Sequence, residues 1–333
     1  MAGPRWHRQR PLKHGPSAGP GDGRYGAHMR IGINGGAMTT GTIDDVIAEA
    51  RRAADDGFHT YWSPQIFALD ALTVFALVGR EVPGIELGTA VVPTYPRHPW
   101  VLAQQARTTQ AAVGGRLALG IGLSHQIVVE GMWGISFAQP VRHLREYLEV
   151  LLPLTRGESV KYRGTTVSAH GALTVPGATP VPVLIAALGP QMLDLAGRKA
   201  DGTITWCVGP KTLEGYTVPT LTAAAERAGR AVPRVVAALP VAVTADRHRL
   251  HERAAEVFQI YGQLPSYRAM LDREGAAGPA DLAIAGSETE VADRLGALRD
   301  IGVTDFGAVE IGADGDESAA TRDLLKRLAP TLA

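Results

Sequence analysis

The stretch Gly114-Gly115-Arg116-Leu117-Ala118-Leu119-Gly120-Ile121 shows the pattern that decides the fold. Its first glycines follow an amphipathic segment, and a short apolar run follows the glycines. Glycine just past a helix end adopts the left-handed conformation that ends the helix. An apolar run bounded by glycine is typical of a strand. The stretch therefore predicts the passage from a helix into a strand.

The same passage occurs three more times along the chain. The three further stretches are 55–62, 201–206 and 301–306. Starts of helices are also marked, because Thr42 with Asp45 and Ser287 with Glu290 have the spacing of a capping box. The chain thus alternates between helices and strands from one end to the other.

This alternation predicts an α/β fold, and we count eight strands with seven connections that can hold a helix. Strand–helix–strand order favours parallel pairing with right-handed crossovers, and eight units over roughly 300 residues are typical of a (β/α)8 TIM barrel. The alternative is a doubly wound open sheet. The adjacent pair Gly35-Gly36 disfavours it, because a dinucleotide fingerprint needs spaced glycines. The predicted strands lie near 30–34, 58–62, 85–92, 116–121, 181–186, 202–206, 234–243 and 304–310.

Two connections are longer than a minimal (β/α)8 barrel needs. Residues 157–180 follow helix 4, and their sequence around Gly164 predicts a hairpin. Residues 246–283 follow strand 7 and form a longer insertion. Long connections at the carboxyl ends of barrel strands commonly shape or cover the site.

Composition narrows the class of protein. The 333 residues include 33 basic and 33 acidic side chains and one cysteine, and no apolar run approaches the ~20 residues of a membrane helix. A strongly basic nucleic-acid binder, a disulfide framework and a multi-cysteine metal site are excluded. We expect a cytoplasmic protein that binds a small-molecule substrate, with no nucleic-acid or membrane partner.

The amino-terminal segment differs from the rest. Residues 1–28 are rich in proline, glycine and basic side chains and poor in aliphatic ones. Such a segment cannot bury enough apolar surface to offset its ordering entropy. We expect a disordered basic arm or an upstream extension there, and a single domain over 29–333.

In a barrel the functional site lies where strands end and helices begin. The candidate residues at these places are Asn34, Gln65, Tyr95, Ser124, His125, Trp206 and Glu310. His125 alone fits either a proton-transfer residue or an ordinary loop histidine. For His98 we expect an ordinary polar contact at a helix start, for Cys207 apolar packing, and for Glu310 exposure to solvent. No histidine and carboxylate cluster predicts a metal.

Residues 187–192 predict an anion pocket. An apolar strand ends, a small-residue loop follows, and a helix begins at Pro190 or Gln191. Proline suits the first helical turn, and the free amides and positive dipole end of a helix attract anions. The loop is equally compatible with a routine strand–helix turn.

Together these segments resemble the luciferase-like monooxygenase superfamily, in particular its branch of oxidoreductases that use the deazaflavin coenzyme F420. The stretches that carry the resemblance are 30–36, 88–99, 114–125 and 186–203, within a span of about 29–310. The resemblance implies a bacterial luciferase-like barrel, and a homodimer.

The resemblance also implies where the coenzyme binds. A non-proline cis peptide is expected in strand three, at the bond Thr89–Ala90, with Val91 and Val92 behind the deazaflavin ring. The backbone of 187–192 would hold the coenzyme's phosphate, and Ser124 would lie near the reactive face. The implied cofactor-binding residues are Asn34, Thr89, Ala90, Val91, Val92, Ser124, Ala187, Leu188, Gly189, Pro190, Gln191 and Met192.

Two positions differ from the sugar-phosphate dehydrogenases of the family. Gln65 and His125 stand where those enzymes have a catalytic histidine and glutamate. Gln65 cannot act as a base, whereas His125 can donate a proton at neutral pH. We expect hydride transfer between F420 and an unsaturated or carbonyl substrate, in a pocket walled by Tyr95, Trp133, Trp206 and Phe67.

Three other functions remain open at this point. The first is an FMN-dependent monooxygenase of the same superfamily that needs a reductase partner. The second is a non-catalytic flavin or deazaflavin binder, because fold alone does not establish function. The third, a sugar-phosphate isomerase or aldolase, would need a lysine or paired carboxylates at strand ends, and the sequence has neither there.

Overall fold

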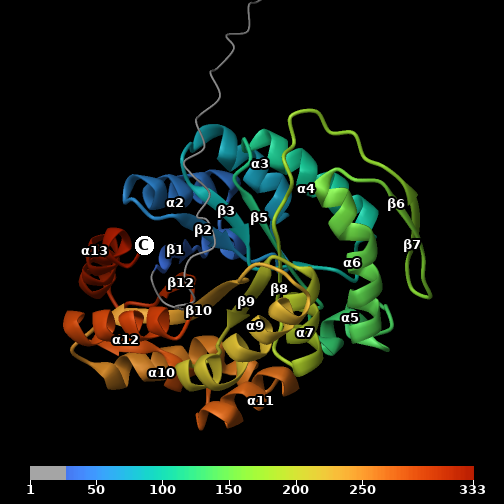
Figure 1. The fold of residues 1–333 in the computed structure, drawn as a ribbon. Coiled ribbons are helices and arrows are strands. Elements are labelled where there is room, and N and C mark those ends of the chain that lie inside the picture. The colour runs from blue at the N-terminus through green and yellow to red at the C-terminus, as the bar shows by residue number, and fades with distance from the viewer. Residues whose placement is uncertain (1–27) are drawn as a thin grey trace, which may run out of the picture.

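The protein forms a closed parallel barrel of eight strands surrounded by helices (Figure 1). It is described by a computed structural model that covers residues 28–333, so the predicted arm lies outside the described residues except for His28. The sheet closes because β9 pairs with β10 as well as with β8. The (β/α)8 prediction is confirmed. The barrel strands are β1 (Arg30–Asn34), β2 (Thr60–Ser63), β3 (Glu86–Thr89), β5 (Leu117–Gly122), β8 (Val183–Ile185), β9 (Gly202–Trp206), β10 (Arg234–Val243) and β12 (Asp305–Glu310).

Helices cover the outside of the barrel. Both predicted capping boxes are present, with the Thr42 hydroxyl accepting from the amide of Asp45 and the Ser287 hydroxyl accepting from the amide of Glu290. The main helices are α2 (Ile43–Asp55), α3 (Ala71–Glu81), α4 (Pro99–Ala112), α6 (Pro140–Arg156), α7 (Pro190–Lys199), α9 (Val218–Arg227), α12 (Glu288–Asp300) and α13 (Gly315–Leu332). The shorter ones are α1 (Ala37–Thr40), α5 (Gln126–Gly131), α8 (Pro210–Thr212) and the single turn η1 (Leu213–Thr217).

The segment after α6 contains the predicted hairpin. Strands β6 (Val160–Arg163) and β7 (Ser168–Gly171) pair antiparallel. The carboxylate of Glu146 accepts hydrogen bonds from the amide and the hydroxyl of Thr166 at 2.6 and 2.8 Å. These bonds favour the charged form and hold the pKa of Glu146 at about 2. The hairpin is thereby fastened to α6.

The 246–283 insertion is helical. It contains α10 (Arg247–Phe258), η2 (Gln259–Gly262), α11 (Pro265–Glu274) and η3 (Pro279–Leu282). A short strand, β11 (Ile284–Gly286), follows it and pairs with the end of β10. We did not predict β11. In Figure 1 the insertion lies along the edge of the barrel, next to α9 and α12.

The amino end of the barrel is filled by Trp62. A Cβ on Gly32 or Gly88 would run into the Trp62 ring, so the absent side chains of these neighbours make its room. Around it pack the inward side chains of other strands, which are Ala118, Leu184, Ile204 and Val236. The barrel is therefore solid at this end.

Charged residues close the same end. The Arg234 guanidinium lies 5.6 Å from the centre of the Trp62 ring and pairs with Glu86 and Asp305, each at 2.8 Å. Arg234 and Arg30 hold the pKa of the buried Asp305 below its usual range against the opposing effect of burial. These ion pairs contribute to stability and not to catalysis, because the active sites of such barrels lie at the opposite end.

Among the helices of residues 28–333, none has the length and apolar character needed to cross a membrane.

Candidate active site at the carboxyl ends of the strands

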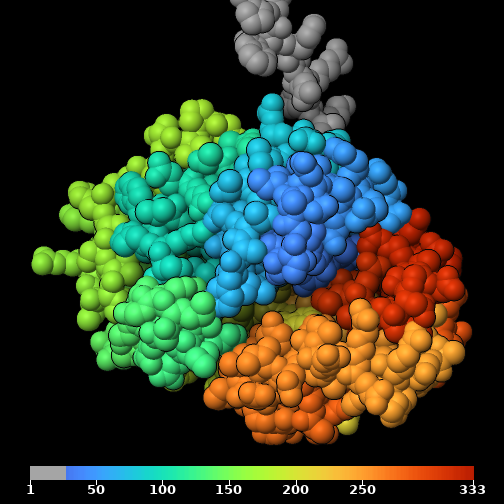
Figure 2. Space-filling model, turned by 180° about the vertical axis from the view of Figure 1, so that it is seen from behind, coloured from blue at the N-terminus to red at the C-terminus, as the bar shows by residue number. Residues whose placement is uncertain are grey.

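The candidate site lies at the carboxyl ends of the barrel strands. Asn34, at the end of β1, pairs with the inward-facing Trp62, so its side chain also faces the inside of the barrel. Trp206, at the end of β9, follows the inward-facing Ile204 by two residues and faces inward because side chains alternate along a strand. Figure 2, which views the molecule from behind relative to Figure 1, shows a hollow where segments coloured blue, green and orange meet. By the colour bar these are the chain after β1, the region of α5 and the insertion.

The third strand is interrupted at the site. Strand β3 ends at Thr89, and the chain resumes as β4 (Val92–Pro93). The cis peptide joins Ala90 to Val91, so our prediction of Thr89–Ala90 was wrong by one residue. Ala90 and Val91 pack against the side chains inside the barrel, whereas Val92 packs into the core between strands and helices.

Two glycines of β5 make room for this interruption. A Cβ on Gly120 would meet the carbonyl of Thr89, and one on Gly122 would meet Val91 and Ala186. The Thr89 hydroxyl donates to the Gly120 carbonyl at 2.8 Å and accepts from the Gly120 amide at 2.9 Å. The result is a floor of small side chains and backbone, which suits a flat ring.

The predicted anion pocket has the expected local structure. Helix α7 begins at Pro190, and its N-cap is Gly189, so no side chain caps it. The amides of Met192 and Leu193 bond the Gly189 carbonyl, while the amide of Gln191 has no partner within the described chain. Ala187 is buried and Leu188 half-buried beside it. An uncapped helix start of this kind can accept an anion.

His125 follows β5 and lies at the start of α5. Its side chain caps no amide of that helix, and the preceding Ser124 has a left-handed backbone with φ 62°. The His125 ring packs against the ring of Tyr267, 5.9 Å away between centres. Burial lowers the pKa of His125, because the charged form loses hydration. His125 is thus half-buried, neutral at pH 7 and free to meet a ligand.

Tyr267 lies in a group of aromatic side chains with Tyr261 and Trp206, of which we predicted only Trp206 as a site residue. The Tyr267 ring lies 5.1 Å from that of Tyr261, which lies 5.7 Å from that of Trp206. The Trp206 indole N–H is buried without a partner. The segment 261–267 offered a signal, since it places two tyrosines around a glycine and a proline. Only the tertiary packing shows that they reach the barrel.

Tyr95 lies in a second aromatic group, after β4. Its ring stacks on His143 of α6 at 4.0 Å and contacts Phe137 at 5.3 Å, and its hydroxyl is buried without a partner. Trp133 is half-buried after α5. Phe67 is 60% exposed.

Gln65 is occupied by neighbouring groups. Its amide oxygen accepts from the amide of Ala71 at 3.2 Å and from the Arg97 guanidinium at 3.3 Å. Arg97 also pairs with Asp70, the N-cap of α3. Gln65 therefore ties the loop after β2 to the loop after β4.

Three further candidates have structural roles. His98 caps α4 by accepting from the amide of Trp100 at 3.2 Å, the polar contact that we expected. Glu310 does not face solvent freely, since it pairs with Arg322 at 2.7 Å on the outside of the barrel, and burial raises its pKa. Cys207 is buried, and burial raises the pKa of its thiol, so it packs as an apolar residue.

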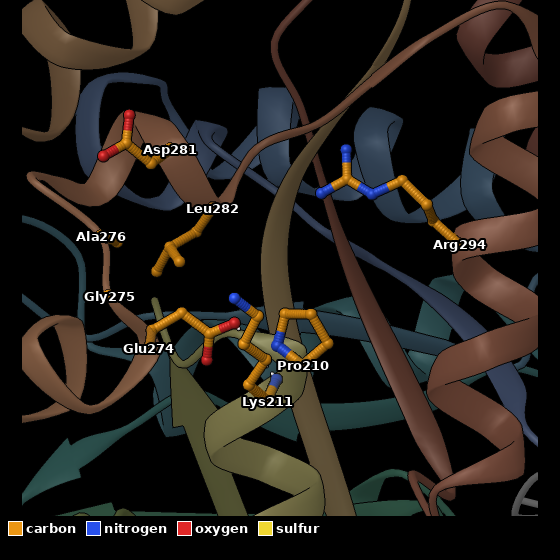
Figure 3. A pocket seen from close by; sticks show the side chains of 8 residues that line it. All are labelled: Pro210, Lys211, Glu274, Gly275, Ala276, Asp281, Leu282 and Arg294. Atoms are coloured by element: carbon orange, nitrogen blue, oxygen red, sulfur yellow. Dashed lines mark hydrogen bonds between the residues drawn. The ribbon is translucent and has the colours of Figure 1, made fainter.

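No cluster of three or more histidine, cysteine or carboxylate side chains in residues 28–333 is placed to hold a metal ion. A pocket of about 240 Å³ lies between α8, the insertion and α12, and none of the predicted site residues lines it. Figure 3 shows the side chains around it, among them Lys211, Glu274 and Arg294.

Comparisons with known proteins agree with this architecture. The model of one protein family, described as luciferase-like monooxygenase, matches residues 25–305. The chain is 30% identical over 228 residues to a 5,10-methylenetetrahydromethanopterin reductase of Methanolobus tindarius, covering 68% of this chain and 69% of that protein. It is 29% identical over 253 residues to an F420-dependent glucose-6-phosphate dehydrogenase of Amycolatopsis mediterranei, covering 71% and 74%.

A solved structure shares the fold. It is the coenzyme F420-dependent tetrahydromethanopterin reductase of Methanopyrus kandleri, with a TM-score of 0.76 and 23% identity. The likeness covers 92% of this chain and 100% of that one.

Proposed function

The chain belongs to the luciferase-like monooxygenase family of enzymes, and we propose that it is an oxidoreductase that transfers a hydride between coenzyme F420 and a small organic substrate. One observation carries the proposal: a floor of Ala90 and Val91 over two glycines lies at the same barrel end as an uncapped helix start. The names of the F420-dependent relatives support it.

The residues of this barrel end fit the coenzyme. A Cβ on Gly122 would crowd Val91, so Val91 can take its place in the floor only because that Cβ is missing. Ala90 and Val91 would hold the ring, with Asn34 and Ser124 around it. The free amide of Gln191 and the dipole of α7 would hold the phosphate.

When bound, F420 supplies or accepts a hydride, so the protein has only to orient the partners and exclude water. His125 would handle the proton. During reduction of a substrate, its protonated ring donates a proton to the developing anion, and during oxidation its neutral ring accepts one. Burial lowers its pKa, so the neutral ring predominates at pH 7 and the proton-donating form gains as pH falls. For Gln65 we propose a role in shaping the mouth through Arg97.

The walls of this space favour an apolar substrate. Tyr95, Trp133 and Trp206 would surround it, and burial without partners leaves the Tyr95 hydroxyl and the Trp206 N–H available as donors. We therefore propose an unsaturated or carbonyl compound as the substrate, whose oxygen or polar group such donors would bind.

Titration of the purified protein with F420, and separately with FMN, tests the proposal through the fluorescence of each compound. Tight binding of F420 with weak binding of FMN is the expected result. Tight binding of FMN alone would overturn the proposal in favour of a reductase-dependent monooxygenase. Binding of neither would overturn the cofactor assignment. We also propose a homodimer, which the resemblance supports, and a cytoplasmic location, which the composition supports; light scattering and cell fractionation would test them.

A further inference from the structure

The insertion is fastened to the rim of the barrel through Glu274, the last residue of α11. Its carboxylate accepts from the amides of Lys211 and Thr212 at 3.1 and 2.8 Å. It thereby satisfies the free amides at the start of α8. Figure 3 shows Glu274 beside Pro210 and Lys211, with the dashed bond between them. Gly209 permits this contact, because a Cβ there would meet the Glu274 side chain.

Two more contacts fix the orientation of α11. The Arg273 guanidinium lies 4.0 Å from the centre of the Tyr216 ring, in the turn η1. Met270 and Leu271 are buried in the main core. These contacts hold the carboxyl half of α11 against the barrel, and none of them involves Tyr267, which lies near the start of α11.

Fixing α11 in this way sets the position of Tyr267 near its start. Its ring contacts His125, at the end of β5, and Tyr261, which in turn contacts Trp206 at the end of β9. Two tyrosines of the insertion therefore span the mouth of the barrel between the fourth and sixth strands. We call Tyr261 and Tyr267 the tyrosine bridge.

The His125 ring depends on this packing. No hydrogen bond from residues 28–333 holds either of its ring nitrogens, and its side chain does not cap α5. A ring without such a bond keeps one orientation only through the surfaces that it touches. Tyr267 supplies an aromatic surface on one side of it.

From these contacts we propose that Tyr267 is a positioning residue: it fixes the His125 ring and keeps water from it, so that the insertion takes part in proton transfer. The inference rests on the function proposed above, in which His125 moves the proton. The insertion would then act on the chemistry through the orientation of one imidazole, without touching the reacting atoms.

The groups around the bridge do not titrate in the range of a histidine. Burial raises the pKa values of Tyr261, Tyr267 and Cys207, so all three stay neutral near pH 7. On α5 itself, the carboxylate of Glu130 is engaged by Gln126 and the amide of Phe137. A change in the titration of His125 after a substitution at Tyr267 would thus report on packing and hydration.

The test compares Tyr267→Leu, which removes the ring, with Tyr267→Phe, which keeps the ring and removes the hydroxyl. The pKa of His125 is measured by NMR in protein labelled at histidine, with His125→Gln to assign the signal. We expect the pKa of His125 to rise in Tyr267→Leu and to stay unchanged in Tyr267→Phe. With F420 and a substrate, Tyr267→Leu should lower kcat about tenfold and leave the Kd for F420 within twofold.

Tyr162→Leu is the matched control, because it removes a half-buried tyrosine of the β6–β7 hairpin that packs on the main core, away from the insertion and His125. Thermal unfolding by circular dichroism shows whether each variant folds. An unchanged His125 titration in folded Tyr267→Leu, or an equal shift in Tyr162→Leu, would overturn the inference. The NMR measurement needs no coenzyme. A failure to bind F420 would therefore refute the proposed function while leaving the contact itself tested.

Discussion

The hydroxyl of Thr89 donates to the carbonyl of Gly120 and accepts from the amide of the same residue, at 2.8 and 2.9 Å. One side chain thus joins the end of β3 to the backbone of β5 at the point where the third strand is interrupted. Both residues are buried, so water cannot replace these bonds. The floor of the candidate site depends on this pair.

Thr89→Val keeps the shape of the side chain and removes both bonds. A buried polar group that loses its partner costs about 1–3 kcal/mol, so we expect a loss of that order in the free energy of unfolding, measured with urea. Thr108→Val removes an exposed bond to the Gln104 carbonyl within α4, and should change the free energy by less than about 0.5 kcal/mol. Equal effects of the two substitutions would contradict the role given to Thr89.

Gly122→Ala tests whether the floor must stay free of side chains. Its new Cβ would crowd Val91 and Ala186, and Val91 is β-branched and cannot easily turn away. We expect the Kd for F420 to rise at least about tenfold, or 1.4 kcal/mol, in fluorescence titration. Gly131→Ala on α5 meets open space and should bind F420 like the parent. Parent-like binding by Gly122→Ala would exclude ring binding on this floor.

His125→Gln removes the proposed proton donor and keeps a polar side chain of similar size. General acid catalysis contributes about 10²–10⁴-fold, so kcat should fall by at least about a hundredfold while F420 still binds. In the parent, the rate of substrate reduction should decline as pH rises past the lowered pKa of His125, and this limb should vanish in the variant. A retained limb would assign the proton to another group.

The same substitution bears on stability. The folded protein binds a proton at His125 more weakly than the unfolded chain does, so acidification below the ordinary value of 6.5 favours unfolding. His125→Gln should therefore lose less stability than the parent between about pH 6.5 and 5. Urea unfolding across this range provides the measurement.

Arg234→Met tests the opposite end of the barrel. It leaves the buried Asp305 with Arg30 as its remaining cation, and breaking a buried pair costs about 3–5 kcal/mol. We expect a loss near the lower figure in urea unfolding, and an unchanged Kd for F420 in the folded variant. Arg299→Met, which removes an ion pair to the exposed Asp300, should change stability by less than about 1 kcal/mol.

The barrel could be predicted from the sequence because local signals coincide with it. Capping boxes at Thr42 and Ser287, and glycines past helix ends such as Gly57 and Gly302, act within a few residues of the chain. The apolar runs between them contain enough residues for a strand. Among the strands of residues 28–333, β11 was missed, because three residues between an insertion and a capping box are too few to show the alternation of a strand.

The site could be predicted less fully, because its parts depend on contacts between distant residues. The run through Val91 and Val92 is typical of a continuous strand, and the interruption arises from packing against Gly120 and Gly122. The bond from Gln65 to Arg97 spans 32 residues, and the contact of His125 with Tyr267 spans more than a hundred. No local pattern encodes such pairs.

The Trp62 ring fills the amino end of the barrel, where Gly32 and Gly88 have no side chains. A ligand can therefore enter only from the carboxyl end. Whatever enters must also leave past the tyrosine bridge. A coenzyme ring on the floor at Ala90 and Val91 would lie beneath any substrate, so it has to arrive first and depart last. Steady-state kinetics should accordingly follow a compulsory order, in which the coenzyme binds first and cannot dissociate until the substrate or product has left.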